Sequence, residues 1–308
     1  MRSIATILLT VGLLTFSRIG GQALAKHSEP RELTAAAVHV DGRDRPKPHT
    51  TEPKRMTTRR GTVVVTPGEC FQGFDAFDVV FHFHGNPFLV ERAWRRNTLN
   101  AALFIMNHGE TTKPYAERYS YREAFDQLIT SAERYVKELC PNAPAKVGRI
   151  ALSGWSAGYA SIQKLIRDDA HAARVDAVLL SDGLHTGLVN KYPRTISETG
   201  LEPFVAFGKQ ALTDGKLMVM THSAIPTVDF ASTTETTDAV LHSLGLLRVL
   251  HLDEERLGAL RMTSEVHEHS FHLMGFEGTE ARDHGDHLRQ LDNTLFNHLR
   301  DRWQVAPE

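Results

Sequence analysis

From residue 61 onward, short apolar runs alternate with longer amphipathic stretches, and this alternation is what most constrains the fold. The apolar runs fall at residues 61–66, 77–85, 101–109, 146–154, 175–183, 216–223 and 260–278. Helical stretches separate them, and in the clearest one, 120–139, Phe125, Leu128 and Val136 share one face. Strands separated by helices form βαβ units. The sequence therefore predicts an α/β fold in one domain, 61–308, with a mostly parallel central sheet and helices on both faces.

The first 25 residues are predicted to be a secretory signal peptide. Arg2 precedes an apolar run over 4–16, and an Ala-Leu-Ala sequence at 23–25 supplies small residues for cleavage after its last residue. The apolar run is too short to cross a bilayer comfortably, so no integral membrane span is expected after cleavage. The alternative is an uncleaved anchor. We therefore expect an exported protein, either secreted or periplasmic.

Residues 26–60 are polar, charged and proline-bearing, and they are predicted to be a flexible linker or arm. Its basic end, 54–60, is interpreted as a solvated tail, with contact to an acidic polymer of the cell envelope as the alternative. The whole chain has a formal net charge of −2, which gives no reason to expect nucleic acid or an anionic membrane as a partner.

The chain has two cysteines, Cys70 and Cys140. Export would remove them from the reducing cytosol, so a disulfide between them is the preferred interpretation. Two buried free thiols are the alternative.

The sequence GWSAG at 154–158 joins a predicted strand to a helical stretch. In that context Ser156 is expected on a strained turn that exposes its Oγ, and the flanking glycines allow strand and helix to pack closely. The amide of Ala157, at the start of the helix, is then able to donate to a developing oxyanion. We predict that Ser156 is a nucleophile; the alternative is an ordinary hydroxyl in a turn.

A second motif, FHFHGNP at 81–87, ends another predicted strand. An acyl-transfer site needs a second oxyanion donor, and the backbone amide of Gly85 or Asn86 is the candidate. The alternative is a zinc ligand pair, because His82 and His84 are two residues apart on a strand.

With these two motifs the chain resembles the α/β-hydrolase superfamily of serine esterases, lipases and related enzymes, and the order of elements over 61–308 agrees. The resemblance implies the chain order Ser, acid, His. Asp182, which follows the apolar strand at 175–183, is the favoured acid, and Asp229 is the reserve. The family more often takes its acid after the next strand, but that strand ends in Thr-His-Ser.

The base is expected between the last strand and the final helix. Many members of the family have a Gly-His there, with a second histidine three positions on, and the pair His284 and His287 has a similar spacing. By this analogy His284 is the base and His287 a packing residue, with His287 as the reserve base.

Other histidines offer competing interpretations. His267, His269 and His272 suggest a zinc site, although in one strand the third would point away from the first two. His185 and His222, at strand ends, are expected to be structural or to contact substrate.

These features predict an exported serine hydrolase, best matched to a carboxylic-ester hydrolase that forms an acyl-enzyme without a cofactor or metal. Its substrate would be a small or lipid-like ester, with residues 183–200 as a covering segment; the sequence does not specify the oligomeric state. The alternatives are a catalytically silent binding protein and a metal-dependent hydrolase. A peptidase or an acyltransferase would use the same triad.

Overall fold

The computed structural model describes residues 52–251 and 255–304. These described residues all belong to one compact unit of the chain. The predicted signal peptide, and the predicted linker up to residue 51, lie outside the described residues. In the described part, no helix is long and apolar enough to cross a membrane.

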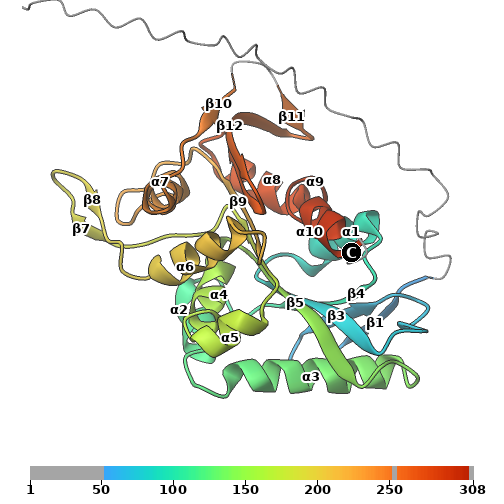
Figure 1. Cartoon of the computed structure of the whole chain (residues 1–308). Helices are drawn as coiled ribbons and strands as arrows, with labels where there is room; N and C mark the ends of the chain where they lie inside the picture. The colour runs from blue at the N-terminus through green and yellow to red at the C-terminus, as the bar shows by residue number, and fades with distance from the viewer. Residues whose placement is uncertain (1–51, 252–254, 305–308) are drawn as a thin grey trace, which may run out of the picture. The chain divides into compact units, whose positions relative to one another are not determined.

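The centre of this unit is a mixed sheet whose strand order is β1-β2-β4-β3-β5-β6-β9-β13-β12-β10, with β11 paired to β12 (Figure 1). The strands are β1 (Lys54–Thr57), β2 (Val63–Thr66), β3 (Ala76–Phe83), β4 (Ala101–Met106), β5 (Lys146–Trp155), β6 (Ala177–Ser181), β7 (Leu188–Asn190), β8 (Thr195–Ile196), β9 (Leu217–His222), β10 (Val249–Leu250), β11 (Arg256–Leu257), β12 (Leu260–Glu268) and β13 (Phe271–Phe276). From β4 to β13 all neighbouring strands are parallel, so the predicted mostly parallel sheet is confirmed.

Helices cover both faces of the sheet, as predicted (Figure 1). They are α1 (Pro87–Asn97), α2 (Thr112–Arg118), α3 (Ala124–Leu139), the 3₁₀ turn η1 (Ser156–Gly158), α4 (Tyr159–Leu165), α5 (Asp169–Arg174), α6 (Glu202–Ala211), α7 (Thr233–Leu244), α8 (Ala281–Arg289), α9 (Leu291–Thr294) and α10 (Phe296–Gln304).

Each face of the sheet has its own apolar core. On β3, Phe81 faces the core formed with α3, α4, α6 and α7, whereas its neighbour Val80 faces the core formed with α1 and α8–α10. This division follows from the period of two along a strand, which sends successive side chains to opposite faces. The buried stretches of the central strands are consequently mostly apolar, as their sequences suggested.

The domain begins earlier than predicted. Residues 54–57, assigned to the linker, form the edge strand β1, which pairs antiparallel with β2 in the register Lys54↔Thr66. Its exposed residues are charged or polar, and Met56 alone packs on the core. The pairing rests on backbone hydrogen bonds rather than on an apolar period, and charged side chains of this kind protect sheet edges.

The last apolar run also differs from its expected form. Residues 260–278 contain two strands, β12 and β13, joined by a tight turn and paired antiparallel. His269 takes a left-handed conformation in that turn, with φ of 51°. The turn contains none of the glycine, proline or asparagine residues that mark a hairpin in a sequence.

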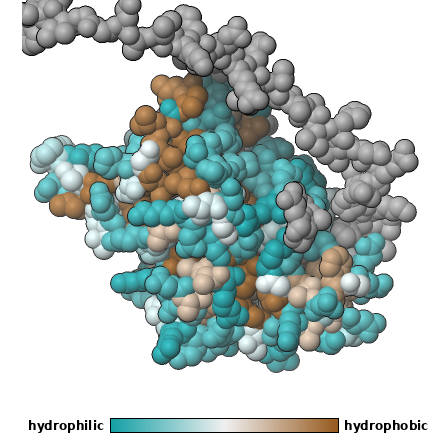
Figure 2. Space-filling view, viewed as in Figure 1, coloured by the Kyte–Doolittle hydropathy of each residue, from teal (hydrophilic) through white to brown (hydrophobic). Residues whose placement is uncertain are grey.

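At β10 the sheet ends in an apolar edge. Figure 2 shows hydrophobic surface at the top of the view, where Figure 1 places β10. Leu247, Val249 and Leu250 are the exposed large hydrophobic residues of this segment.

A disulfide joins Cys70, in the turn after β2, to Cys140, at the C-terminal end of α3. The preferred interpretation of the two cysteines is therefore confirmed. Both residues are buried, and the bond ties α3 to the edge of the sheet.

Candidate active site

Ser156 lies on a sharp turn between β5 and α4. Its φ is 49°, a left-handed value that is uncommon for a residue with a side chain and stores strain. The turn is crowded: a Cβ atom on Gly158 would lie 2.0 Å from the carbonyl oxygen of Phe83 on the neighbouring strand β3. The small residues of GWSAG are therefore needed to bring the elbow against the sheet.

Asp182 and His284 are brought together from distant parts of the chain. Asp182 follows β6, His284 lies on α8, and the Nδ1 atom of His284 is 2.6 Å from Oδ2 of Asp182. The Asp182 end of β6 also approaches the elbow, since a Cβ atom on Gly183 would lie 2.5 Å from the backbone oxygen of Ser156. The candidate acid therefore holds the candidate base beside the turn that carries Ser156.

The carboxylate of Asp182 is buried, with 2% of its side chain exposed, and is held by three donors. Besides His284, Oδ1 accepts hydrogen bonds of 2.8 Å from the Ser223 amide and from the Thr233 hydroxyl. Burial acts to raise the pKa of Asp182, but the hydrogen bond from His284 and the neighbouring histidines outweigh it and bring this pKa below its ordinary value. The ionised carboxylate keeps the Nδ1 proton on His284, which leaves Nε2 to accept a proton.

Sequence reasoning did not identify Ser223 and Thr233. They come from the loop after β9 and from the first turn of α7. Only the fold shows that both point at Asp182, because neither lies in a recognisable motif.

Trp155, next to the nucleophile, is stacked between two histidines. Its ring centroid lies 4.5 Å from that of His284 and 5.1 Å from that of His84, with interplanar angles of 26° and 10°. Its indole N–H also donates a 3.0 Å hydrogen bond to the backbone oxygen of His284. Trp155, at the end of β5, therefore holds both the ring and the backbone of the candidate base on α8.

Of the two backbone amides expected as the second oxyanion donor, the structure leaves one without an acceptor in the part of the chain that it describes. The Gly85 amide donates to Oδ1 of Asn107 at 3.0 Å, and Asn107 Nδ2 returns a 2.9 Å bond to the Gly85 oxygen, so this amide is not available for substrate. Asn86 is exposed, its side chain caps α1, and its N–H meets no acceptor among the described residues. Asn86 therefore remains the candidate for the second donor, beside the candidate Ala157, which lies in the first turn after Ser156.

No protein-family model matches the chain, and none of the curated proteins searched matches it. Solved structures do match. A zinc-bound cold-adapted esterase from an Arctic intertidal metagenomic library is 13% identical, with 79% of this chain and 92% of that one covered and a TM-score of 0.39. Est1E from Butyrivibrio proteoclasticus is 10% identical, with 82% and 99% covered and a TM-score of 0.42. A structure named FAE is 6% identical, with 83% and 90% covered and a TM-score of 0.48.

Likenesses this low show nothing about the activity of the chain, and its own structure identifies the fold. A mostly parallel sheet carries a strained strand–serine–helix turn, with an Asp–His pair after it in chain order. The chain has the α/β-hydrolase fold.

The two reserve residues lie elsewhere in this hydrolase fold. His287 is fully buried, and burial lowers its pKa to about 4. Its Nδ1 lies 2.9 Å from the Thr221 hydroxyl, which accepts a hydrogen bond from the Asp182 amide. Asp229 instead pairs with Lys191 at 2.7 Å, with 76% of its side chain exposed. His287 thus supports the turn that carries Asp182, and Asp229 has no contact with His284.

The suspected metal ligands make other contacts. Both ring nitrogens of buried His82 are used, by Ser153 Oγ at 2.8 Å and by the His84 oxygen at 3.0 Å. His267 and His272 face each other across the β12–β13 hairpin, with 2.8 Å between their Nδ1 atoms, and His269 pairs with Asp214. Over residues 52–251 and 255–304, no group of three or more His, Cys, Asp or Glu residues is arranged to hold a metal ion.

The remaining histidines near the site make structural contacts. His185 Nδ1 donates to the Ala231 oxygen at 3.0 Å, and its ring meets Phe230 edge-on. His222 is buried, and its Nε2 lies 2.7 Å from a guanidinium nitrogen of Arg248.

Within the predicted covering segment, β7 and β8 form a separate hairpin that exposes 95% of Tyr192.

Proposed function

We propose that the protein is a serine hydrolase that cleaves carboxylic esters through Ser156, His284 and Asp182. The observation that carries this proposal is the 2.6 Å hydrogen bond between His284 and the buried, ionised Asp182, beside a serine held at a strained φ. A structural turn has no need of such a pair, whereas an activated serine requires one.

In the proposed reaction, Nε2 of His284 takes the proton from Ser156 Oγ as the oxygen attacks the ester carbonyl carbon. The carbonyl oxygen gains negative charge and accepts hydrogen bonds from the amides of Ala157 and Asn86. The C–O bond to the alcohol then breaks, and His284 returns the proton to the leaving oxygen. Water repeats the sequence on the acyl-enzyme and releases the acid and free Ser156.

Two features support efficient proton transfer. Asp182 stays ionised because three donors hold it, so it stabilises the imidazolium that forms on His284. Trp155 presents its face to the same ring, and aromatic faces attract cations. One well-placed oxyanion donor adds roughly a hundredfold or more to the rate in enzymes of this kind.

We also propose that the protein is exported. The N-terminal sequence supports this proposal, as does the Cys70–Cys140 disulfide, because such bonds persist in oxidising compartments. A mature chain that starts at residue 26 in the mass spectrum of exported protein is the expected result.

The deciding experiment is the intact mass of the protein after reaction with a fluorophosphonate probe. We expect one adduct on the parent and on Ser243→Ala, a control in an exposed hydroxyl on α7, and none on Ser156→Ala. Hydrolysis of short-chain esters should be absent in Ser156→Ala. In the parent, a chelator should leave this hydrolysis unchanged. No adduct on the parent would favour a silent binding protein, loss of activity with a chelator would favour a metal enzyme, and cleavage of amides but not esters would favour a peptidase.

A further inference from the structure

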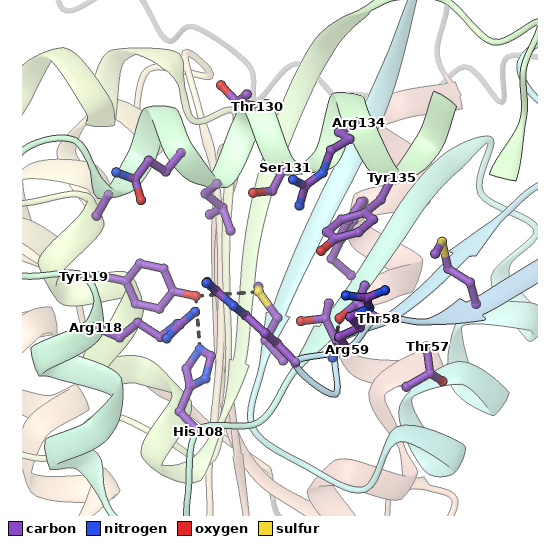
Figure 3. Close-up of a pocket in the computed structure, with 18 of the residues that line it drawn as sticks. Thr57, Thr58, Arg59, His108, Arg118, Tyr119, Thr130, Ser131, Arg134 and Tyr135 are labelled. Carbon is purple, nitrogen blue, oxygen red and sulfur yellow. Dashed lines mark hydrogen bonds between the residues drawn. The ribbon is translucent and has the colours of Figure 1, made fainter. Parts of the chain in front are cut away.

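A second site lies outside the candidate active centre, in a groove of about 1120 Å³. One wall is α3, the opposite wall is β1 with the turn that follows it, and the end of α2 closes one end. None of Ser156, Asp182 and His284 lines it. Figure 3 shows Thr130, Ser131 and Arg134 along the helix, Arg118 and His108 at one end, and Thr58 and Arg59 at the other.

The groove is rich in positive charge. Among its described lining residues are four arginines, Arg59, Arg60, Arg118 and Arg134, against two glutamates. In the described part of the chain, no carboxylate pairs with any of these arginines. One of the glutamates, Glu117, faces Lys113 at 3.7 Å. Because the whole chain has a formal charge of −2, this local excess is a property of the groove and not of the surface at large.

The rest of the lining suits a hydroxylated ligand. Hydroxyl groups come from both walls, with Thr58 on one side and Ser131 on the other, and Phe104 is among the apolar lining residues. The Arg134 guanidinium lies over the Tyr135 ring, 4.5 Å from its centroid, so the charge is held against an aromatic side chain. Guanidinium groups bind carboxylates in a planar, two-pronged geometry.

His108 contributes no charge at neutral pH. Burial, and then the neighbouring Arg118, lower its pKa to about 4, and its Nε2 lies 3.1 Å from the Tyr119 hydroxyl. The charge of the groove therefore comes from the arginines, which stay charged at any pH the protein meets.

We propose that this groove binds an acidic oligosaccharide, with the arginines contacting carboxylates on successive sugars and the hydroxyl side chains contacting the sugar hydroxyls. The size of the groove supports an oligomer, because sites for single small ligands are mostly smaller. The net negative charge of the chain disfavours nucleic acid. The basic segment 54–60, whose sequence suggested a solvated tail, contributes Arg59 and Arg60 to the site.

The test is the affinity of the full protein for hexagalacturonate, measured beside uncharged cellohexaose and oligo(dT). Hexagalacturonate should bind, and its Kd should rise with salt because exposed charges are screened. The Arg59→Gln/Arg60→Gln double variant and Arg134→Gln should each weaken binding, the double variant by roughly tenfold. Arg300→Gln, on α10 and outside the groove, should bind like the parent.

Thermal unfolding of each variant shows whether weaker binding reflects a lost contact or a lost fold. Arg134→Lys keeps the charge but loses the planar fork, so its Kd should lie between those of the parent and Arg134→Gln. Equal binding of cellohexaose, unchanged binding by the arginine variants, or tighter binding of oligo(dT) would each overturn the proposal. Because the probe is not an ester and the readout is binding, the result is independent of the proposed hydrolysis.

Discussion

At the scale of single residues, Trp155 links the parts of the candidate site. It precedes Ser156 on β5, its ring lies between those of His84 and His284, and its N–H holds the backbone of His284. The pattern G-x-S-x-G leaves this position open, so the sequence gives no sign of its role. In this molecule the residue at the variable position of the motif contacts both the ring and the backbone of the proposed base.

We predict that Trp155→Leu lowers kcat for ester hydrolysis by roughly tenfold, because His284 loses an aromatic face worth about 1–2 kcal/mol to its charged form. Trp155→Phe, which keeps a face but not the N–H, should retain most of the activity. Steady-state kinetics on a small ester give kcat and KM separately. KM should change little, because the proposed role of the Trp155 ring is to stabilise charged His284 and not to bind the ester. If the two variants lose the same kcat while unfolding at the parent's temperature, the stacked face has no part in positioning.

The sequence was enough to propose Asp182 as the acid, but it did not show which groups would hold its carboxylate. An Asp after an apolar strand singled out Asp182, and β9 lacked a carboxylate at its end. The structure shows what the end of β9 does instead: the Ser223 amide and the Thr221 hydroxyl bind Asp182. Contacts between neighbouring strand ends depend on strand order, which no local pattern specifies.

At the scale of elements, apolar runs predicted the buried strands well and the edges poorly. The buried parts of β3 and β5 are mostly apolar because helices cover both faces of the sheet there. Edge strand β1 gains its stability from backbone pairing and has charged side chains, so its sequence is typical of a linker. The sequence did not indicate the turn between β12 and β13, because His269 occupies the left-handed position where glycine or asparagine is usual.

The disulfide between Cys70 and Cys140 links two elements and should stabilise the fold. It closes a loop with a sequence separation of 70 residues between β2 and α3. We predict that Cys70→Ala/Cys140→Ala lowers the free energy of unfolding by about 4 kcal/mol, because the unfolded chain regains the entropy of that loop. Denaturant unfolding measures the difference. Reductant should destabilise the parent by a similar amount and leave the variant unchanged; a parent indifferent to reductant would contradict the prediction.

At the scale of the whole molecule, the histidines make folding sensitive to acid. In the described part of the chain, burial is the main cause that lowers the pKa of His82 and His272 to about 3 and of four others to about 4. Those four are His108, His222, His287 and His298. In the unfolded chain each has an ordinary pKa near 6.5. The unfolded state therefore takes up these protons first as the pH falls.

We predict that the free energy of unfolding is nearly constant above pH 7 and falls steadily as the pH drops from about 6.5 to about 4. The sign follows from linkage: stability rises with pH wherever the unfolded state binds more protons. A fully buried histidine such as His82 contributes a loss of about 2 kcal/mol between pH 7 and pH 5. Asp182, with its lowered pKa, adds to the loss only at still lower pH. Denaturant titrations at several pH values measure the curve.

A matched pair of variants assigns this slope to buried rings. His298, on α10, stacks on His272 at 4.4 Å between ring centroids, whereas His242, on α7, is exposed. His298→Gln removes a group that is neutral in the folded state and protonated in the unfolded state at pH 5, so the slope between pH 6.5 and pH 4 should decrease. His242→Gln makes the same substitution at an exposed position and serves as the control. Equal slopes in the two variants would show that the acid sensitivity has another source, because only a difference in protons bound between the two states changes stability with pH.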